Sequence, residues 1–578
     1  MDAAVLPEII GFHMESWLEN AGIVGLTRIL DEDDYAIKDN QLSIKTSALK
    51  TIDKSFFKFF IDTYGKYTRY QQIINWLPKI EATIQMDFEN YNFQEYETYV
   101  KWFNDNVKYF VKSGSYRRMR PLVHPEIPIE KYLDTVTKLF KGLSKKKRWE
   151  DTADNPEQEL AMLFAELKKI VQYFADDTSK RYFLAKNLVY RYVNKGWDGI
   201  SFLNSQSKIV DIYQDYYNYF VQPVIDFLSE SHRKGKIICA TCGRKMRSKE
   251  GSGYSFLNGM GYDYGKKNSN AYMFNSDQFL CPVCRLMYSA VPAGFAYNLA
   301  GNHGIFVNYT GQSLENLRNA NDGILDTLTE TFRRTDNNVS PWGAFYETFR
   351  QGFNKSSQYT LANTQVINRK DEHYYFSLIP EITANVLKKI EKIKINKKKD
   401  VTLLSALNKA LIPEYRGIQY CSIYDEVIKR LLNQTNMNSL LNDMLLLKAS
   451  NKQNIYITAT QILYVVEINV LLFNELGVIK LDSKVLSKIH GYGMEVAKGY
   501  RTNPNKAKAL AYQLLQALKM QNQEKFMNIL LNCYLYQQKI IPSVFQQIRN
   551  TEVFNQLGYA FIAGLISGEE KGRVQNEK

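Results

Sequence analysis

Hydrophobic residues recur at helical spacing over much of the first half of the chain. WLENAGIVGLTRIL (17–30) predicts a helix, and the stretch 50–110 predicts several packed ones. Between them, DEDDYAIKDNQLSIK predicts a turn followed by short strands. Asn155-Pro156 fits the N-cap and first position of a long helix. The apolar face of that helix is formed by Leu160, Leu163, Leu167, Ile170 and Phe174.

The pattern changes near residue 231, where glycine, asparagine and cysteine become frequent and the helical period is lost until after residue 309. Within this region GIFVNYT (304–310) predicts a strand. Helical spacing returns toward the C-terminus in segments joined by short polar stretches, which is typical of an antiparallel helical bundle. The shared faces of these segments are formed by Leu510, Leu514, Ala517 and Leu518, by Phe526, Leu530 and Cys533, and by Val553, Leu557, Phe561 and Leu565.

Composition narrows the class of protein. With 578 residues, 45% hydrophobic and 23% charged, the chain is long enough for several domains and is typical of a folded protein. The 74 Lys and Arg exceed the 60 Asp and Glu, and a net charge of +14 favours a polyanionic partner, most often nucleic acid. ILYVVEINVLLF (462–473) contains Glu467 and Asn469 and is too short to cross a membrane, so it predicts a buried helix. Six cysteines and no signal peptide favour a reducing cytoplasm.

Four cysteines form two C-x-x-C pairs, Cys239/Cys242 in CATCGRK and Cys281/Cys284 in FLCPVCRLM, with 38 residues between the pairs. Each pair follows two apolar residues, so each predicts a strand leading into a tight knuckle whose backbone N–H groups point at the sulfurs. Two facing knuckles supply four thiolates in tetrahedral geometry, which suits a structural Zn²⁺. Gly243 fits this geometry because the residue after the second ligand often needs a positive φ.

A redox role is the alternative for one pair, since a C-x-x-C at the start of a helix is typical of thiol exchange, but it leaves the other pair unexplained. His232 and His303 are possible substitute ligands, although four cysteines already complete a closed site. Cys533 falls on an apolar helical face and is interpreted as a core residue. The sequence assigns no role to Cys421.

The residues between the pairs exceed the usual spacing of a zinc ribbon and predict an inserted loop. GSGYSFLNGMGYDYGKKNSN (251–270) does not match a nucleotide phosphate loop, because the glycine spacing is wrong and a lysine replaces the magnesium-binding hydroxyl. Its chemistry is that of a flexible, cationic finger able to enter a DNA groove, and a disordered polar insertion is the equal alternative. The candidate contacts are Asn258, Lys266, Lys267, Asn268 and Asn270.

Two other basic clusters are candidates for contacts to a nucleic-acid backbone, and they comprise Arg117, Arg118 and Arg120, and Lys145, Lys146, Lys147 and Arg148. LKKIEKIKINKKKD (387–400) is also basic, but a solvated helix face is the preferred interpretation. Searches for catalytic motifs fail: the chain has no H-E-x-x-H, no G-x-S-x-G and no deaminase signature. We therefore expect a protein that is not an enzyme.

These residues resemble a known family, the large subunit of type I-B CRISPR interference complexes (Cascade), in the branch named for its CXXC–CXXC signature. Beyond the paired cysteines, the resemblance rests on WLENAGIVGL near the start, GWDGISFLN at 196–204 and FNQLGYAFIAGLI at 554–566. It implies a non-catalytic subunit of an RNA-guided complex that recognises the protospacer-adjacent motif in duplex DNA, helps to open the duplex and recruits the helicase–nuclease.

The resemblance also implies the partners and the organisation. Expected partners are CRISPR RNA, target double-stranded DNA with its displaced strand, the helicase–nuclease, and the backbone, handle-binding and small subunits. In several relatives an internal start codon yields the small subunit, for which Met437 and Met444 are candidates here. Two other functions stay open: a zinc-containing nuclease or nucleic-acid-modifying enzyme, and a scaffold for acidic proteins.

The predicted fold is mixed, mainly α with small β elements. Residues 1–230 form a mostly helical N-terminal domain with basic patches, and 311–436 continue it. A four-cysteine, zinc-ribbon-like module with its inserted loop occupies 231–310, and a C-terminal helical bundle occupies 437–578.

Overall fold

The computed structural model describes most of the chain, with several internal gaps. The described residues are 6–86, 88, 91–145, 156–194, 197, 199–204, 206–230, 235–254, 256–257, 278–298, 303–308, 313–334, 341–353, 364–370, 373–396, 401–415, 418–450, 456–500, 504–547 and 550–576. Over these residues the protein is mainly helical with small sheets, as predicted.

The chain divides into two compact units. Unit 1 comprises residues 1–341 and 367–376, and unit 2 comprises residues 342–366 and 377–578. The boundary passes through two adjacent strands, β8 (Thr364–Lys370) and β9 (His373–Ile379). The four-segment organisation predicted from composition stays a prediction.

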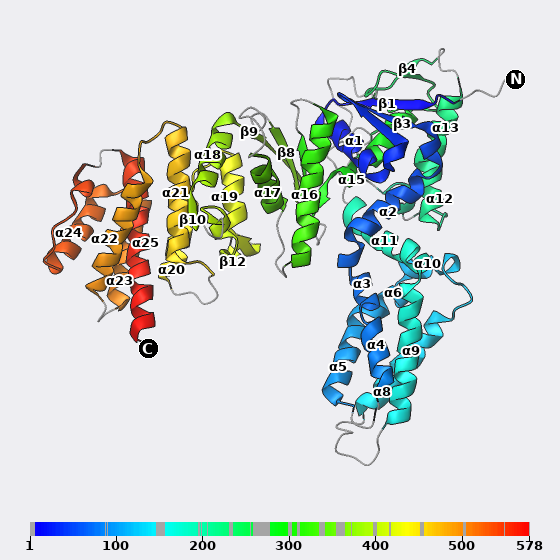
Figure 1. The fold of residues 1–578 in the computed structure, drawn as a ribbon, viewed down its shortest axis with the longest axis horizontal. Helices are drawn as coiled ribbons and strands as arrows, with labels where there is room; N and C mark the ends of the chain where they lie inside the picture. Colours follow the sequence, from blue (N-terminus) through cyan, green and yellow to red (C-terminus); the bar gives the residue numbers. More distant parts are fainter. Residues whose placement is uncertain are drawn as a thin grey trace. The chain divides into compact units, whose positions relative to one another are not determined.

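Unit 1 begins with a three-stranded antiparallel sheet and one helix. The strands β1 (Ile9–His13), β2 (Tyr35–Lys38) and β3 (Gln41–Lys45) pair in the order β1-β3-β2, and helix α1 (Trp17–Ile29) follows the first strand (Figure 1). Alternate residues of β1 and β3 are buried, so this sheet has one apolar face. The predicted helix at 17–30 and the predicted turn and strands after it are confirmed.

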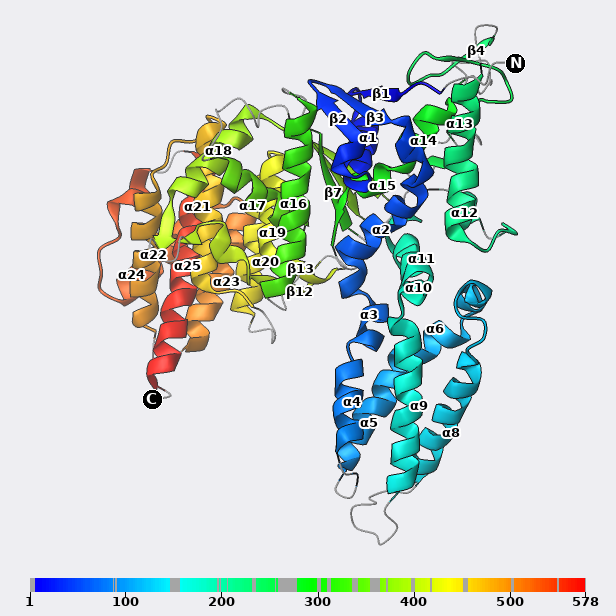
Figure 2. The same cartoon turned by 45° about the vertical axis from the view of Figure 1, so that its right-hand side comes forward.

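An elongated group of helices makes up the next part of unit 1. Helix α9 (Glu157–Ala175) packs against α8 (Ile129–Lys145) and α4 (Leu77–Gln85), and Figure 2 shows α4, α5, α8 and α9 side by side. The predicted apolar face of α9 is buried throughout, which confirms the helix, but Pro156 takes the N-cap position and not the predicted first helical position, and Asn155 lies outside the described residues. The neighbouring helices are α2 (Ile52–Tyr64), α3 (Arg69–Ile74), α5 (Phe93–Trp102), α6 (Lys108–Lys112) and α7 (Gly114–Arg117), with a π-helical turn η5 (Phe103–Val107) before α6.

The remaining described helices of unit 1 connect this group to the cysteine region and the second sheet. They are α10 (Asp177–Ser179), α11 (Ala185–Leu188), α12 (Ile212–Tyr216), α13 (Gln222–Ser229), α14 (Pro282–Ser289), α15 (Val291–Gly294) and α16 (Leu314–Arg334), with π-helical turns η8 (Lys180–Leu184), η9 (Val189–Val193) and η11 (Tyr217–Val221). The second sheet has the order β6-β7-β8-β9, with β6 at Ala296–Tyr297 and β7 at His303–Asn308. The strand predicted at 304–310 is therefore confirmed over its described residues.

Unit 2 combines small hairpins with long helices. Its strands are β10 (Lys394–Asn396), β11 (Val401–Thr402), β12 (Leu411–Tyr415) and β13 (Ile418–Ser422), paired as β10-β11 and β12-β13. Its helices are α17 (Pro341–Phe353), α18 (Glu381–Lys392), α19 (Ile423–Leu432), α20 (Asn438–Ala449), α21 (Ala459–Glu475), α22 (Ser483–Lys498), α23 (Pro504–Lys519), α24 (Gln523–Tyr536) and α25 (Thr551–Asn576). The basic segment 387–400 thus ends α18, whose face at Leu387 and Ile390 is buried, and then enters β10.

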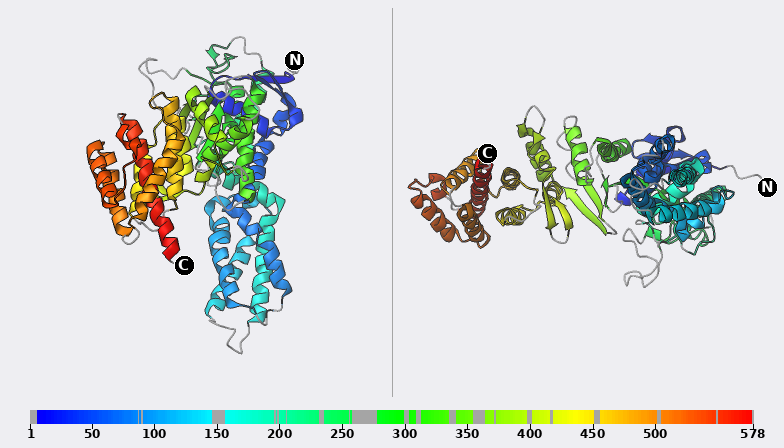
Figure 3. Two further views of the ribbon diagram at one scale, coloured as in Figure 1. Left: turned by 60° about the vertical axis from the view of Figure 1, so that its left-hand side comes forward. Right: turned by 90° about the horizontal axis from the view of Figure 1, so that it is seen from below.

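The C-terminal helices form the predicted bundle. Helix α25 packs against α21, α22 and α23, and the orange and red helices stand side by side in Figure 3. The segment 462–473 lies in α21 and is largely buried, as expected. Within the described part of the chain, no helix combines the length and the apolar character that a membrane span requires. Met437 and Met444 are fully buried at the start and in the middle of α20, and an internal start there stays a prediction.

Candidate metal centre

The first cysteine pair sits in a tight β-hairpin. Strand β4 (Ile237–Ile238) pairs antiparallel with β5 (Lys245–Met246), and the turn between them carries Cys239 and Cys242. The backbone N–H of Cys239 donates to the carbonyl of Arg244 at 2.9 Å, and the N–H of Gly243 donates to the carbonyl of Cys239 at 3.0 Å. Gly243 has a φ of +69°, which confirms the positive φ predicted after the second cysteine. The first pair is therefore the predicted knuckle.

The second pair has a different local structure. Phe279 forms a β-bridge with Cys239, and Leu280 forms one with Ser252. Backbone hydrogen bonds therefore hold this segment beside the first knuckle and the residues that follow it. Cys281 then caps helix α14, because its sulfur accepts the N–H of Cys284 at 3.4 Å and Pro282 follows at the first helical position. The second pair has the predicted extended lead-in and N–H-to-sulfur contact, but the chain continues into a helix after Cys281 and does not form a hairpin like the first pair.

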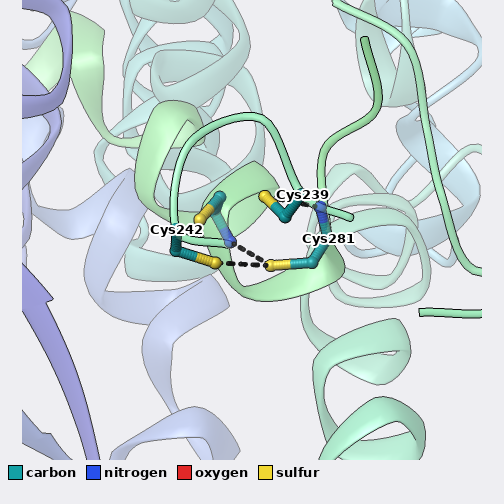
Figure 4. A group of neighbouring side chains, drawn as sticks. Cys239, Cys242 and Cys281 are labelled. Atoms are coloured by element: carbon teal, nitrogen blue, oxygen red, sulfur yellow. Dashed lines mark hydrogen bonds between the residues drawn. The ribbon is translucent and has the colours of Figure 1, made fainter. Parts of the chain in front are cut away.

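The two pairs bring four sulfurs together. All four lie within 4.8 Å of one another, and the sulfurs of Cys242 and Cys281 are 3.6 Å apart (Figure 4). A tetrahedral Zn²⁺ site with ~2.3 Å metal–sulfur bonds has sulfur–sulfur edges of about 3.8 Å, so this spacing fits such an ion. Cys239, Cys281 and Cys284 are buried and only Cys242 is exposed. The arrangement could hold one metal ion in a closed, four-coordinate site.

Backbone donors and crowded thiols make the cluster electrostatically uneven. The N–H of Cys281 donates to the sulfur of Cys239 at 3.3 Å, as predicted for N–H groups aimed at the ligands. Hydrogen bonds from the thiols of Cys242, Cys281 and Cys284 hold the pKa of Cys239 well below its usual range. The hydrogen bond of Cys284 to Cys239, contacts with the other two thiols and burial raise the pKa of Cys284. Without a cation the four thiols therefore do not all ionise together, and a divalent ion would replace the shared protons.

Arg244 connects the cluster to the N-terminal strand. Its guanidinium donates to the sulfur of Cys242 at 3.5 Å and to the carbonyl of Gly11 on β1 at 3.4 Å. Because four thiolates around a divalent cation would carry a net charge of about −2, Arg244 would stabilise a loaded site and hold the Cys242 sulfur in place. Cys242, the exposed cysteine of the cluster, is thus the one whose sulfur the Arg244 guanidinium contacts.

Thr241, between the first two cysteines, joins a second set of hydrogen bonds. Its hydroxyl lies 3.0 Å from that of Tyr288 on α14 and 2.9 Å from that of Tyr254. Tyr288 in turn donates to the carboxylate of Glu19 on α1. This chain of polar groups ties the knuckle to the helix that carries Cys284 and to the N-terminal helix.

Helix α1 also packs directly against α14 and α15. A Cβ on Gly25 would lie 1.9 Å from the carbonyl oxygen of Ala290, and one on Gly22 would lie 2.7 Å from that of Met287. A Cβ on Gly294 would lie 2.0 Å from the carbonyl oxygen of Ala21. The backbones therefore touch, and only glycine permits this approach. The segment WLENAGIVGL is thus the support on which the second cysteine pair rests.

The other candidate ligands and cysteines lie apart from the cluster. His303 on β7 is hydrogen-bonded to Asn368, and His232 lies outside the described residues. Cys533 is buried on α24, which confirms its interpretation as a core residue, and Cys421 is buried on β13.

Most of the candidate nucleic-acid contacts lie outside the described residues. These are Asn258, Lys266, Lys267, Asn268 and Asn270 in the inserted loop, and Lys146, Lys147 and Arg148 after α8. Lys145 is exposed at the last position of α8. The inserted segment leaves the described structure after Leu257 and returns at Gln278, directly before the second pair.

The three arginines near residue 118 do not share one environment. Arg120 and Arg117 both pair with Glu130, at 2.6 and 2.9 Å, and Arg120 also donates to the carbonyl of Val111. The Arg120 hydrogen bond lowers the pKa of Glu130, so this pair is charged near neutral pH. Arg118 is exposed and donates to the carbonyl of Ser207 at 3.2 Å. Of the three arginines, Arg118 is the one that forms no ion pair with a carboxylate among the described residues.

Sequence reasoning missed the residues that support the cluster. Glu19 and Tyr288 lie 269 positions apart, and no spacing rule links them. Arg244 and Thr241 were adjacent to the cysteines and so were visible, but their partners on β1 and α14 emerge only in three dimensions.

Comparisons with known proteins bear on the same region. Residues 232–296 match a protein-family model described as CRISPR-associated protein (Cas_CXXC_CXXC). No curated protein and no solved structure matches the chain significantly. The matched residues include both cysteine pairs and the helices α14 and α15. The match supports a CRISPR-associated protein that carries a CXXC–CXXC motif.

Proposed function

We propose that this chain is the non-catalytic large subunit of a type I-B CRISPR RNA-guided surveillance complex that acts in antiviral defence. One observation carries the proposal: the residues that match the CRISPR-associated family are the residues that assemble the four-sulfur cluster. The net charge of +14 supports a nucleic-acid partner. The partners would be CRISPR RNA, target duplex DNA with its displaced strand, the other complex subunits and a helicase–nuclease.

In this proposal the metal is a structural Zn²⁺ held by Cys239, Cys242, Cys281 and Cys284. The four cysteines complete a tetrahedral shell and leave no position for substrate, which supports a structural ion over a catalytic one. The ion would fix two segments from which the inserted loop begins and ends. The metal would therefore hold the loop in place and take no part in bond breaking.

The inserted loop would read the adjacent motif while the guide RNA reads the target. Exchange of a DNA duplex for an RNA–DNA duplex is close to balanced in free energy, so the protein needs only to start the opening beside the motif. Asn258, Lys266, Lys267, Asn268 and Asn270 provide amide and ammonium groups suited to base edges and phosphates. Arg118 and Lys145 would contact backbone phosphates.

The zinc assignment is tested by elemental analysis of the purified full-length chain. We expect about one zinc per chain, and Cys281→Ser with Cys284→Ser should abolish it. Cys421→Ser is the matched control, because that thiol is also buried but lies apart from the cluster. Zinc-free protein with an unchanged thermal unfolding temperature would contradict a structural metal.

The subunit assignment is tested by co-expression of the chain with the other complex subunits and a CRISPR array. We expect co-purification with guide RNA and capture of target DNA only beside one short motif. Lys266→Ala with Lys267→Ala should leave assembly intact and reduce the log–log salt slope of target binding by about 2. The charge control is Lys38→Ala with Lys50→Ala, two exposed lysines elsewhere. Metal-dependent cleavage of labelled DNA or RNA by the chain alone would contradict a non-catalytic role.

A further inference from the structure

A strip of cations and exposed tyrosines crosses the helices of unit 1 away from the cysteine cluster. It combines residues of α6 with Arg118 and with the α11–η9 segment. Tyr109 on α6 and Tyr190 on η9 are 49% and 44% exposed, which is unusual for large rings in a unit where most aromatic side chains are buried. The strip comprises Lys108, Tyr109, Lys112, Arg118, Lys186 and Tyr190.

Defined contacts hold the two halves of the strip together. The ring of Tyr109 packs edge-on against buried Tyr116 at 5.8 Å, and the amide of Asn187 on α11 donates to the Tyr116 hydroxyl at 3.2 Å. Lys186 donates to the carbonyl of Ser115 at 3.2 Å, and its ammonium lies 5.9 Å from the centre of the Tyr190 ring. These contacts join residues 108–118 to residues 186–190, so the rings and charges of both segments lie near one another.

The cations of the strip lie close to one another and to Lys141. Burial and then the charge of Arg118 lower the pKa of Lys186. Burial and then the charges of Lys112 and Lys141 lower the pKa of Lys108. Among the described residues, no carboxylate forms an ion pair with Lys108, Lys112, Arg118 or Lys186. Such like-charge crowding is relieved when an anion neutralises the surface.

We propose that this strip binds single-stranded nucleic acid, with the bases stacked on Tyr109 and Tyr190 and the phosphates at Lys112, Arg118 and Lys186. Exposed rings can stack only on bases that are unpaired, and flanking cations suit the phosphates between them. A duplex would use the cations alone. The inference deepens the proposed function and rests on it, because that function supplies both guide RNA and an opened DNA strand.

The test measures binding of the full-length chain to a fluorescein-labelled 20-mer of thymidylate and to a duplex of the same length. Tyr109→Ala with Tyr190→Ala should weaken binding of the single strand about thirtyfold or more, since two stacked bases contribute about 1–3 kcal/mol each, and should leave duplex binding nearly unchanged. Tyr109→Phe with Tyr190→Phe should bind the single strand about as well as wild type, because phenylalanine keeps the ring. Tyr420→Ala, which removes a tyrosine 57% exposed in unit 2, is the matched control.

A second variant tests the charges. Lys112→Gln with Arg118→Gln should reduce the log–log salt slope for the single strand by about 1.4, at roughly 0.7 per phosphate contact. Lys38→Gln with Lys50→Gln is the charge control. The proposal is overturned if the wild-type chain fails to bind the 20-mer at low salt, or if the tyrosine variant binds it like the control. These measurements use no guide RNA and no other subunit, so their outcome is separate from the assembly test of the proposed function.

Discussion

Replacement of Gly25 by alanine perturbs the contact on which the second cysteine pair rests. The new Cβ would lie 1.9 Å from the carbonyl oxygen of Ala290 and 3.1 Å from the nitrogen of Gly294. Both are backbone atoms, so no side-chain rotation relieves the clash, and α1 and α15 would have to separate by about 1.5 Å. Overpacking of this kind costs about 1–3 kcal/mol. Because the unfolding entropy scales with the size of unit 1, we expect Gly25→Ala to lower its unfolding temperature by about 1–4 °C.

The matched control is the same substitution at Gly142. This glycine lies in the interior of α8, is exposed, and has no atom within 4 Å of the position a Cβ would take. Alanine stabilises a helix interior relative to glycine by about 1 kcal/mol, so Gly142→Ala should raise the unfolding temperature slightly. Thermal unfolding followed by circular dichroism separates the two signs. Equal stability of Gly25→Ala and wild type would refute the close packing of α1 on α15.

Two further substitutions test unit 2. Burial raises the pKa of Glu467 from 4.5 to about 7. The carboxyl therefore loses its proton at lower pH in the unfolded chain than in the folded one, and the free energy of unfolding falls as the pH rises between those values. Glu467→Gln should stabilise the protein by about 1–3 kcal/mol at pH 8 and by little at pH 4, measured by urea unfolding. Asn469 is fully buried, and its side-chain amide donates to Asn438 at 2.9 Å and to Gln556 at 3.0 Å. Asn469→Ala should therefore lower the free energy of unfolding by about 2–4 kcal/mol. The control, Asn528→Ala on the exposed face of α24, should lower it by under about 1 kcal/mol. A stability difference between Glu467→Gln and wild type that is the same at pH 4 and pH 8, or equal losses for the two asparagine variants, would contradict these burial arguments.

Periodicity predicted the fold where packing agrees with local pattern. The helix at Trp17, the long helix after Pro156 and the buried segment in α21 have strong apolar faces, and each appears at the expected residues. The division of the chain into two units was not predictable in this way. Its boundary passes through β8 and β9, and the pairing of strands distant in sequence leaves no compositional mark.

The candidate site was predictable in its ligands and not in its supports. Two C-x-x-C pairs have few physical explanations other than a shared ion, and the four sulfurs do converge. The helix that starts at Cys281 was missed because Pro-Val-Cys-Arg is short and carries no strong helical period. Arg120 was predicted as a phosphate contact from its charge alone, and its ion pair with Glu130 depends on the first turn of α8, where Glu130 lies ten residues later.

The β-bridge between Ser252 and Leu280 bears on which changes of sequence and length the fold tolerates during evolution. Both ends of the segment 258–277 enter structure that is already fastened to the cysteine cluster. Since doubling the length of a closed loop costs only about 0.6 kcal/mol, this segment can be lengthened, shortened or exchanged with little penalty to the rest of the fold. Changes confined to this stretch should therefore leave the four-sulfur cluster assembled.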